Sequence, residues 1–335
     1  MAGGGTKPSI KRRITAADVA EKAGVSQPTV SRALSGSPLI TDATRLKVEE
    51  AARSLGYLVD KRASRLRRGD TGIIAVVVVS RAGAGFRSTN PMTYSLLGAT
   101  CAAAAARGME TLVSFQSEPT DFFGQYVRQG EADALIAIGT RENEEAWQVL
   151  TQSGAADDPH AFWGEDVLPD NTEGARLVVE HLLSTGRRRI AFIGAQDGHR
   201  QFEERQAGYQ AAIEAAGLEA RAIMVDPQQE RHEQGAEAIR ELLAERGGCD
   251  AVFASCDAIA IGAVGELQAQ GVAVPDNLAV AGFDGLGIGE QIVPALTTVA
   301  TDVSMAGEML VARALGGEAG KALRVPVSLR TGGSA

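Results

Sequence analysis

The 335-residue chain is long enough for two or three domains, and its net charge of −9 conceals a strong asymmetry. Residues 1–70 carry 14 Lys and Arg against 7 Asp and Glu, whereas residues 71–335 carry 19 against 35, so the two parts have charges of +7 and −16. A cationic N-terminal part suits a polyanion such as double-stranded DNA, which the acidic remainder repels.

Several classes of protein lack support in this sequence. The most apolar strand-like run, GIIAVVVV, has eight residues, so no membrane span is expected. Cys101, Cys249 and Cys256 lack metal-ligand spacing and predict a reduced, cytoplasmic compartment. The four histidines form no cluster, so no metal site is expected. The RAGAGF stretch lacks the third glycine of a dinucleotide loop, and no nucleophile motif is present, which predicts neither a cofactor nor an enzyme.

The first ordered segment, expected over residues 14–58, has the pattern of three short helices. Thr15 and Ser26 are good N-caps for the first two, and the third starts at Thr41 or Asp42. Two helices around a tight turn, followed by a supporting helix, are typical of a helix-turn-helix domain. Apolar residues at helical spacing form its expected core: Val19, Ala20, Ala23, Val30, Ala33, Leu34, Leu46, Val48, Ala52 and Leu55.

The second helix has a polar outer face that suits DNA. In helix-turn-helix proteins this helix lies in the major groove, where Gln pairs with adenine and Arg with guanine. Hydroxyl groups and helix N-terminal amides suit phosphate oxygens. A small packing module with a solvated charged face is the alternative. The candidate DNA-binding residues in this domain are Thr15, Ser26, Gln27, Pro28, Thr29, Ser31 and Arg32.

The stretch DVAEKAGVSQPTVSRALSG resembles the N-terminal motif of the lactose-repressor (LacI/GalR) family of bacterial transcription regulators, and the likeness continues to the C-terminus. The resemblance implies that Gln27 and Pro28 select the operator sequence and that Arg32 reads a guanine. Pro28 departs from the polar residue often found at this position. Base reading there is therefore expected through shape or apolar contact.

Residues 59–70 are dense in positive charge and, taken alone, indicate a solvated basic linker. The resemblance implies a hinge helix, which folds when two protomers bind DNA together and inserts a leucine into the minor groove. Leu66 falls on that leucine. Val59 and Asp60 depart from the proline and asparagine that the family often has there.

From Thr71 onward, strand-like runs alternate with helical ones, which is typical of an α/β fold with parallel sheets covered on both faces. Eight or more strands can form one long sheet, a barrel or two doubly wound lobes, and spacing does not choose among these. The resemblance implies two lobes of doubly wound parallel sheets, of the periplasmic-binding-protein type, with a ligand between them. Three crossings between the lobes are expected near residues 166–170, 295–298 and 323–328.

These expectations divide the whole chain into predicted domains. The C-terminal RTGGSA is expected to be a disordered end. The predicted parts are a disordered tail (1–13), the helix-turn-helix domain (14–58), the hinge (59–70) and an effector-binding and dimerisation domain (71–331), with an N-lobe over about 71–167 and 298–323 and a C-lobe over about 170–295 plus the C-terminal strand.

Two residues stand out as effector ligands. Ligands of open α/β sheets bind beyond the carboxyl ends of the strands. Asp284 ends the run LAVAGFD, and its carboxylate can accept hydrogen bonds from vicinal hydroxyls. Arg205, in FEERQAGY, offers a planar fork of donors. Both match family positions that contact the effector, and a structural salt bridge is the alternative.

Four further residues complete the candidate effector site. Cys256 stands where relatives often carry asparagine, and Glu165 substitutes for an acidic residue that relatives place slightly earlier. Trp163 and Phe86 can stack on a sugar ring, although large aromatic residues more often belong to a core. Asp257 is expected to be the N-cap of the following helix rather than a ligand.

Together these features predict a cytoplasmic repressor of a carbohydrate catabolic operon that binds a pseudo-palindromic operator as a homodimer. A small sugar-type effector releases it by preferring one lobe arrangement. A corepressor-type regulator that responds to a purine or another non-sugar ligand is the alternative. A sugar-binding protein without a DNA role would lack the helix-turn-helix, and a sugar-modifying enzyme would need catalytic residues that the sequence does not show.

Overall fold

The fold is that of a computed structural model of the whole chain, which divides into two compact units: a head, Met1–Asp70, and a body, Thr71–Ala335. The structure describes residues 14–57, 69–80, 90–117, 124–139, 143–152, 159–195, 200–226, 229–245, 248–316 and 320–335.

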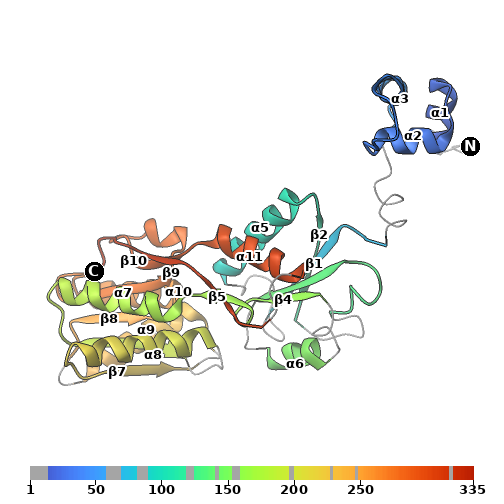
Figure 1. The fold of residues 1–335 in the computed structure, drawn as a ribbon. Coiled ribbons are helices and arrows are strands. Elements are labelled where there is room, and N and C mark those ends of the chain that lie inside the picture. Colours follow the sequence, from blue (N-terminus) through green and yellow to red (C-terminus); the bar gives the residue numbers. More distant parts are fainter. Residues whose placement is uncertain are drawn as a thin grey trace, which may run out of the picture. The chain divides into compact units, whose positions relative to one another are not determined.

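Over residues 14–57 the head forms three helices, each with a capped start: α1 (Ala16–Ala23), α2 (Gln27–Leu34) and α3 (Asp42–Leu55) (Figure 1). The side chains of Thr15, Ser26 and Thr41 each accept a hydrogen bond from a first-turn backbone N–H. Gly24, at φ 61°, ends α1 in the left-handed conformation that glycine adopts without strain. These local signals explain why the sequence predicts these helices.

A small apolar cluster holds the three helices of the head together. Val19, Val30 and Val48, one from each helix, are fully buried at its centre. The prediction that Leu46 belongs to this core is wrong, because its side chain is 66% exposed. Leu46 precedes the buried Val48 by two positions, about 200° around a helix, so both cannot face the same core.

The N-lobe of the body is a four-stranded parallel sheet in the order β2-β1-β3-β4. Its central strand is a run of β-branched residues buried on both faces, as a covered parallel sheet requires. Helices α5 and α11, far apart in the sequence, lie side by side over one face, and α6 covers the other (Figure 1). The elements are β1 (Ile73–Val79), α5 (Pro91–Ala106), β2 (Glu110–Gln116), β3 (Ala134–Gly139), α6 (Glu144–Gln152), β4 (His160–Phe162) and α11 (Val303–Ala314).

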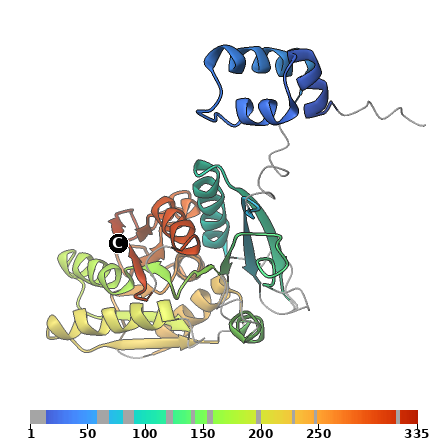
Figure 2. The ribbon, with the colours of Figure 1, turned by 45° about the vertical axis from the view of Figure 1, so that its right-hand side comes forward.

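The C-lobe is a six-stranded sheet in the order β12-β10-β9-β8-β6-β7, with only β12 antiparallel. Helices α7 and α8 cover one face, and α9 and α10 cover the other (Figure 2). The elements are α7 (Asn171–Ser184), β6 (Ile190–Ala195), α8 (Arg200–Ala215), β7 (Arg221–Val225), α9 (Arg231–Ala244), β8 (Ala251–Ala254), α10 (Asp257–Ala269), β9 (Ala279–Asp284), the 3-10 helix η2 (Gly287–Glu290), β10 (Thr297–Thr301) and β12 (Val327–Arg330).

The chain passes between the lobes at three places. Strands β5 (Val167–Pro169) and β11 (Leu323–Val325) pair in parallel as a separate two-stranded sheet. The third passage follows Thr301, because β10 pairs with β9 and β12 inside the C-lobe sheet. The expected crossing near 295–298, and with it an N-lobe segment beginning at 298, is therefore wrong, since strand pairing keeps β10 in the C-lobe.

The expectation of a disordered C-terminal end is also wrong. Ser334 is fully buried, and its hydroxyl donates to the carbonyl of Val280 (2.6 Å) and accepts from the backbone N–H of Thr297 (2.8 Å). The backbone of Val280 also donates to the Ser334 carbonyl (2.8 Å). These bonds extend the C-lobe beyond residue 331, although a Gly- and Ser-rich sequence gives no apolar signal of it.

Candidate functional site

The first candidate site is the outer surface of α2. Buried Val30 and Ala33 fix the inner face of this helix against the head core. Its first turn holds no acidic side chain, so the positive end of the helix dipole is not neutralised there. The side-chain hydrogen-bond donors and acceptors on this surface can therefore bind a polyanion. The exposed candidate residues on it are Ser26, Gln27, Pro28, Ser31 and Arg32.

Three of the candidate phosphate-binding hydroxyls already take part in helix caps. Thr15 forms a capping box with Asp18, in which its hydroxyl donates to the Asp18 carboxylate (2.7 Å). The Ser26 hydroxyl accepts from the Thr29 backbone N–H (3.3 Å), and the hydroxyls of Ser26 and Thr29 share a hydrogen bond of 2.8 Å. A phosphate contact by any of these hydroxyls therefore competes with or extends a cap.

The second candidate site is a buried polar cluster in the C-lobe around Arg205, which is 2% exposed. The structure brings Arg205, on α8, together with Asp284, the last residue of β9: Nη1 donates to Asp284 Oδ1 at 3.2 Å and to the Ser255 carbonyl at 2.5 Å. The guanidinium carbon lies 3.6 Å from the ring centre of Phe283. Arg205 and Asp284 thus form the salt bridge that the sequence analysis gave as the alternative to effector binding, and an effector bound here would contact the same two side chains.

Burial dominates the electrostatics of this pair. It lowers the pKa of Arg205 and raises that of Asp284 to about 6, while their mutual attraction opposes both changes. Asp284 also has φ 124°, a backbone conformation that residues other than glycine rarely adopt. Strain of this kind is concentrated at binding and catalytic sites, where the surrounding structure maintains it.

Asp257 has a different role from the N-cap that the sequence suggests. Cys256 occupies the N-cap position of α10, and Asp257 is the first helical residue. The Asp257 carboxylate accepts from the Leu286 backbone N–H (2.7 Å) and from the Thr298 hydroxyl (2.5 Å). It therefore holds the segment after β9 against α10, next to Asp284. Burial, then the nearby Asp284 charge, raise the pKa of Asp257 to about 7.

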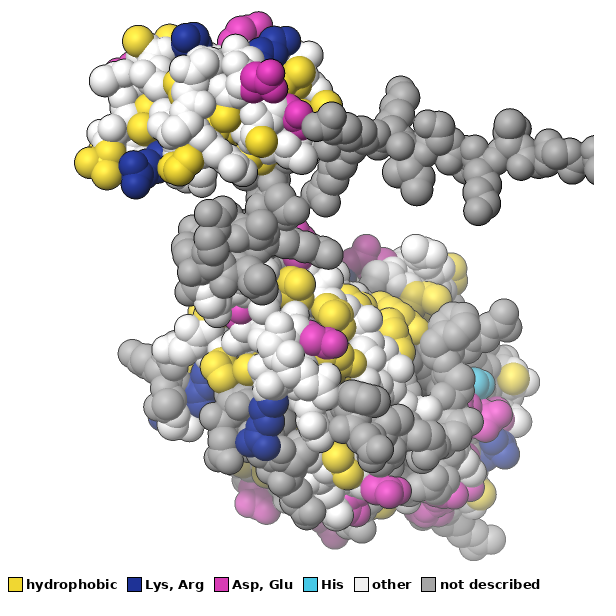
Figure 3. Space-filling view, turned by 90° about the vertical axis from the view of Figure 1, so that its right-hand side faces the viewer, with side chains coloured by type: hydrophobic (Ala, Val, Ile, Leu, Met, Phe, Trp, Pro, Cys, Tyr) yellow, Lys and Arg dark blue, Asp and Glu magenta, His cyan; other side chains and the backbone are white. Residues whose placement is uncertain are grey.

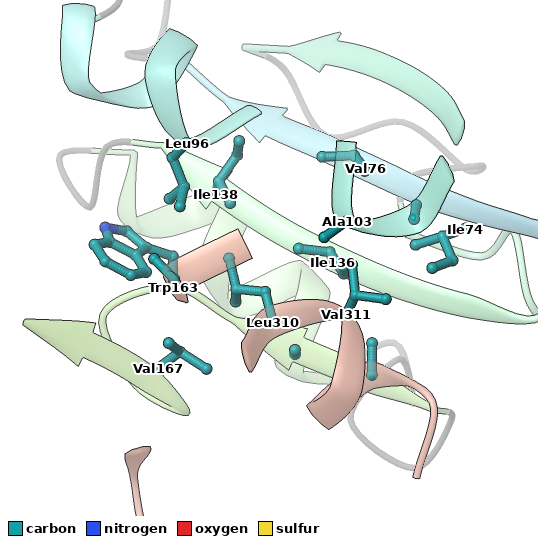
Figure 4. Close-up of a cluster of buried hydrophobic side chains, with 14 of the residues drawn as sticks. Ile74, Val76, Leu96, Ala103, Ile136, Ile138, Trp163, Val167, Leu310 and Val311 are labelled. Atoms are coloured by element: carbon teal, nitrogen blue, oxygen red, sulfur yellow. The ribbon is translucent and has the colours of Figure 1, made fainter. Parts of the chain in front are cut away.

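The remaining effector candidates differ in their surroundings. Cys256 is buried, and burial raises the pKa of its thiol to about 12. Its side chain is therefore an uncharged thiol at neutral pH. Trp163 is 8% exposed and packs in the N-lobe core beside Leu96, Ile138 and Leu310, which favours the packing role (Figure 4). Glu165 is half-buried. Phe86 and Leu66 lie outside the described residues.

The sequence interpretation missed Asn171, the first residue of α7 and fully buried. Its Oδ1 accepts from Arg205 Nε at 2.9 Å, and its Nδ2 donates to Glu204 Oε2 at 2.9 Å. The signal in the sequence is weak, because an Asp-Asn pair before a helix also indicates ordinary capping. The partners of Asn171 lie more than 30 residues away in the chain and are set by the packing of α7 on α8.

No helix in the described part of the chain is long and apolar enough to cross a membrane. Within the same residues, no group of three or more His, Cys, Asp and Glu side chains is placed to hold a metal ion.

A helix-turn-helix head on a body of two α/β lobes defines a class of DNA-binding regulators. Comparison with known proteins agrees: residues 15–60 match the model of bacterial regulatory proteins, lacI family, and residues 179–335 match a periplasmic binding protein-like domain. The transcriptional regulator GntR of Pseudomonas aeruginosa is 31% identical over 328 residues, or 93% of this chain and 91% of its own. The chain belongs to the LacI family of bacterial transcriptional regulators.

Solved structures support the same fold. A complex of the transcriptional regulator CelR with cellobiose has a TM-score of 0.67 and 29% identity, covering 96% of this chain and all of that one. A lac repressor dimer bound to operator and an anti-inducer has a TM-score of 0.77 and 23% identity, covering 96% and 99%. The matches place this chain among transcriptional regulators.

Proposed function

We propose that this regulator represses a carbohydrate catabolic operon in the cytoplasm and that a sugar-type effector releases it from a pseudo-palindromic operator. The observation that carries the proposal is the polar, exposed face of α2 on a capped helix-turn-helix head. Such a helix reads base edges in the major groove, and a two-fold dimer requires two related half-sites.

In this proposal each α2 residue has a defined task. Gln27 pairs with an adenine and Arg32 with a guanine, while Pro28 reads by apolar contact. The hydroxyls of Thr15, Ser26, Thr29 and Ser31 contact phosphates and set the register. Residues 59–70 fold as a hinge on DNA and insert Leu66 into the minor groove. The proposed domains keep the boundaries 14–58 and 59–70, and the effector domain extends from 71 to the C-terminus.

A homodimer is proposed because the body exposes apolar side chains at one edge of its N-lobe sheet. Strand β2 is at the edge of the N-lobe sheet, and Val113 and Phe115 on it are 40% and 44% exposed. Tyr94 of α5, also exposed, stacks at a tilt on Phe115 with ring centres 6.1 Å apart. Figure 3 shows hydrophobic side chains on the surface of the body on this side. The lac repressor structure is described as a dimer on its operator.

The proposed effector site is centred on Asp284 and Arg205. Both lie at the carboxyl ends of β8 and β9, where ligands of open α/β sheets bind. An arginine fork and a carboxylate together offer the donors and acceptors that a polyhydroxylated ligand needs. The CelR structure was obtained with cellobiose, which makes this disaccharide the first probe to use.

The corepressor alternative differs in the direction in which the effector changes operator affinity. An effector that binds the DNA-competent lobe arrangement more tightly strengthens operator binding, and one that prefers the other arrangement weakens it. Release by a sugar supports the inducer mechanism, whereas tightening by a purine or another ligand establishes the alternative.

Operator binding is tested by fluorescence anisotropy on the DNA upstream of the chain's own gene and its neighbours. Replacing Arg32 by Ala is expected to weaken specific binding by about 5- to 150-fold, which corresponds to about 1–3 kcal/mol for one bidentate base contact. The matched control is Arg53→Ala, which removes an exposed arginine that pairs with Glu50 on α3. Equal affinities of wild type and Arg32→Ala for the specific site disprove base reading by Arg32.

Effector response is tested by titrating cellobiose, other sugars, nucleosides and purines into the protein–DNA complex. Release by one sugar is the expected result. Asp284→Asn should then remove the response while operator binding without the sugar persists. A retained response at unchanged sugar concentration would remove Asp284 from the effector site.

A further inference from the structure

A continuous series of hydrogen bonds connects the Arg205 cluster to one of the crossings between the lobes. It runs from Asp284 to Arg205 (3.2 Å), from Arg205 to Asn171 (2.9 Å) and from Asn171 to Glu204 (2.9 Å). Arg324 of β11 then binds Glu204 with both terminal nitrogens, at 2.5 and 2.8 Å. Four contacts therefore separate the proposed effector carboxylate from β11.

The last contact joins the two lobes. Glu204 belongs to α8, which packs in the C-lobe. Arg324 belongs to β11, whose Val325 is buried in the N-lobe core together with Val167 of β5. The Arg324 guanidinium also donates to the carbonyl of Pro169 in β5 (3.3 Å). A movement of Glu204 relative to Arg324 is thus a movement of α8 relative to two crossing strands.

The side chain of Asn171 is matched to its two neighbours. Its carbonyl oxygen accepts from a cation, and its amide nitrogen donates to a carboxylate. An aspartate places a second negative charge against Glu204, and an aliphatic residue of similar size makes neither bond. Partial burial by itself raises the pKa of the Glu204 carboxyl. The hydrogen bonds from Arg324, Asn171 and Arg200 outweigh this effect and lower the pKa to about 2. Glu204 is therefore a carboxylate throughout the physiological range.

Capping of α7 does not explain this side chain. The N-cap of α7 is Asp170, whose carboxylate accepts from the Glu173 backbone N–H at 3.2 Å. The Asn171 side chain points instead to two residues on α8, 33 and 34 positions away. Its bonding groups are thus used for tertiary contacts.

We propose that Asn171 is a positioning residue that couples Arg205 to the Glu204–Arg324 ion pair between the lobes. A ligand that takes over donors of Arg205 or the carboxylate of Asp284 shifts the guanidinium, and Asn171 passes that shift to the crossing strands. As a route for effector control, the inference rests on the proposed function. As a physical coupling, it is testable without DNA or ligand.

The test perturbs one end of the series and measures the other. Asp284→Asn weakens the pull on Arg205, and hydrogen exchange of the backbone amides of Leu323 and Val325 reports the state of β11. In the full-length wild-type background, we expect Asp284→Asn to change their exchange by about fivefold or more, the lower end of typical site-to-site coupling. In the Asn171→Ala background the same change should have no effect at these amides.

Two further variants separate coupling from simple damage. Asn171→Asp alone should disrupt the series through its charge, and adding Glu204→Gln should restore it, because the glutamine amide can donate to the new carboxylate and its oxygen can still accept from Arg324. Glu173→Gln, on the exposed surface of α7 beside Arg176, is the matched control and should leave the transmission unchanged.

Every result bears on the proposal. It is overturned if Asp284→Asn leaves the β11 amides unchanged, if it changes them equally with and without Asn171, or if Glu204→Gln fails to rescue Asn171→Asp. Because no operator DNA or sugar is present, failure of the repressor proposal in the anisotropy experiments does not alter the outcome here.

Discussion

The two candidate sites are built in opposite ways. Gln27 and Arg32 project from α2 into solvent, and the head core lies behind them. Arg205 and Asn171 are inside the C-lobe, where every polar contact also holds the fold together. The difference teaches that the base-reading side chains of Gln27 and Arg32 can vary at little cost to stability, whereas a change of effector specificity must preserve a buried network.

The largest expected effect comes from breaking the buried pair. Arg205→Ala leaves the Asp284 carboxylate buried without its cation, and we expect the free energy of unfolding of the body to fall by about 3–5 kcal/mol. Arg32→Ala, on the exposed surface of α2, should change the stability of the head by less than about 0.5 kcal/mol. Urea denaturation of the full chain measures both, and similar losses for the two variants would contradict the comparison.

The next effect concerns the close packing of helices α9 and α10 in the body. A Cβ on Gly262 of α10 would lie 1.9 Å from the His232 carbonyl oxygen on α9. Gly262→Ala should therefore cost about 1–3 kcal/mol of stability by overpacking. Gly265, on the same helix, has nothing within 4 Å of such a Cβ. Gly265→Ala is the matched control and should be neutral or raise the melting temperature.

A smaller effect is expected in the head at a residue with two proposed roles. Thr15→Ala removes the capping box of α1 and should lower the stability of the head by about 1 kcal/mol. Thermal melting of the full chain followed by circular dichroism measures the change, with Ala17→Ser on the exposed first turn as the control. If Thr15→Ala also weakens operator binding at a temperature where the head stays folded, this result would support the proposed phosphate contact of Thr15. An unchanged melting curve would show that the cap is not formed in solution.

The last effect depends on pH and involves Glu204. Because its pKa is lowered in the folded protein to about 2, its contribution is fully present above the unfolded value of 4.5 and is lost as pH falls towards 2. The stability difference between wild type and Glu204→Gln, from urea denaturation, should therefore shrink between pH 5 and pH 3. A difference that stays constant over this interval would mean that the Arg324 pair does not stabilise the carboxylate.

The elements predicted from sequence are those with local causes. The N-caps at Thr15 and Ser26 and the glycine at position 24 delimit the head helices. Runs of β-branched residues buried on both faces mark strands such as β1. Leu46 shows the limit of periodicity, because an apolar residue within a helical segment was assigned to the core although its side chain faces solvent.

The sequence by itself determined the three helices of the head and the alternation of strands and helices in the body, and the family motif marked Arg205 and Asp284 as candidate ligands, because each follows from nearby residues or from a motif. Only the tertiary structure decided that β10 stays in the C-lobe sheet, that Ser334 closes its end and that Asn171 joins Arg205 to Glu204. These features depend on hydrogen bonds between residues tens of positions apart, and no local pattern records which partners the folded chain will bring together.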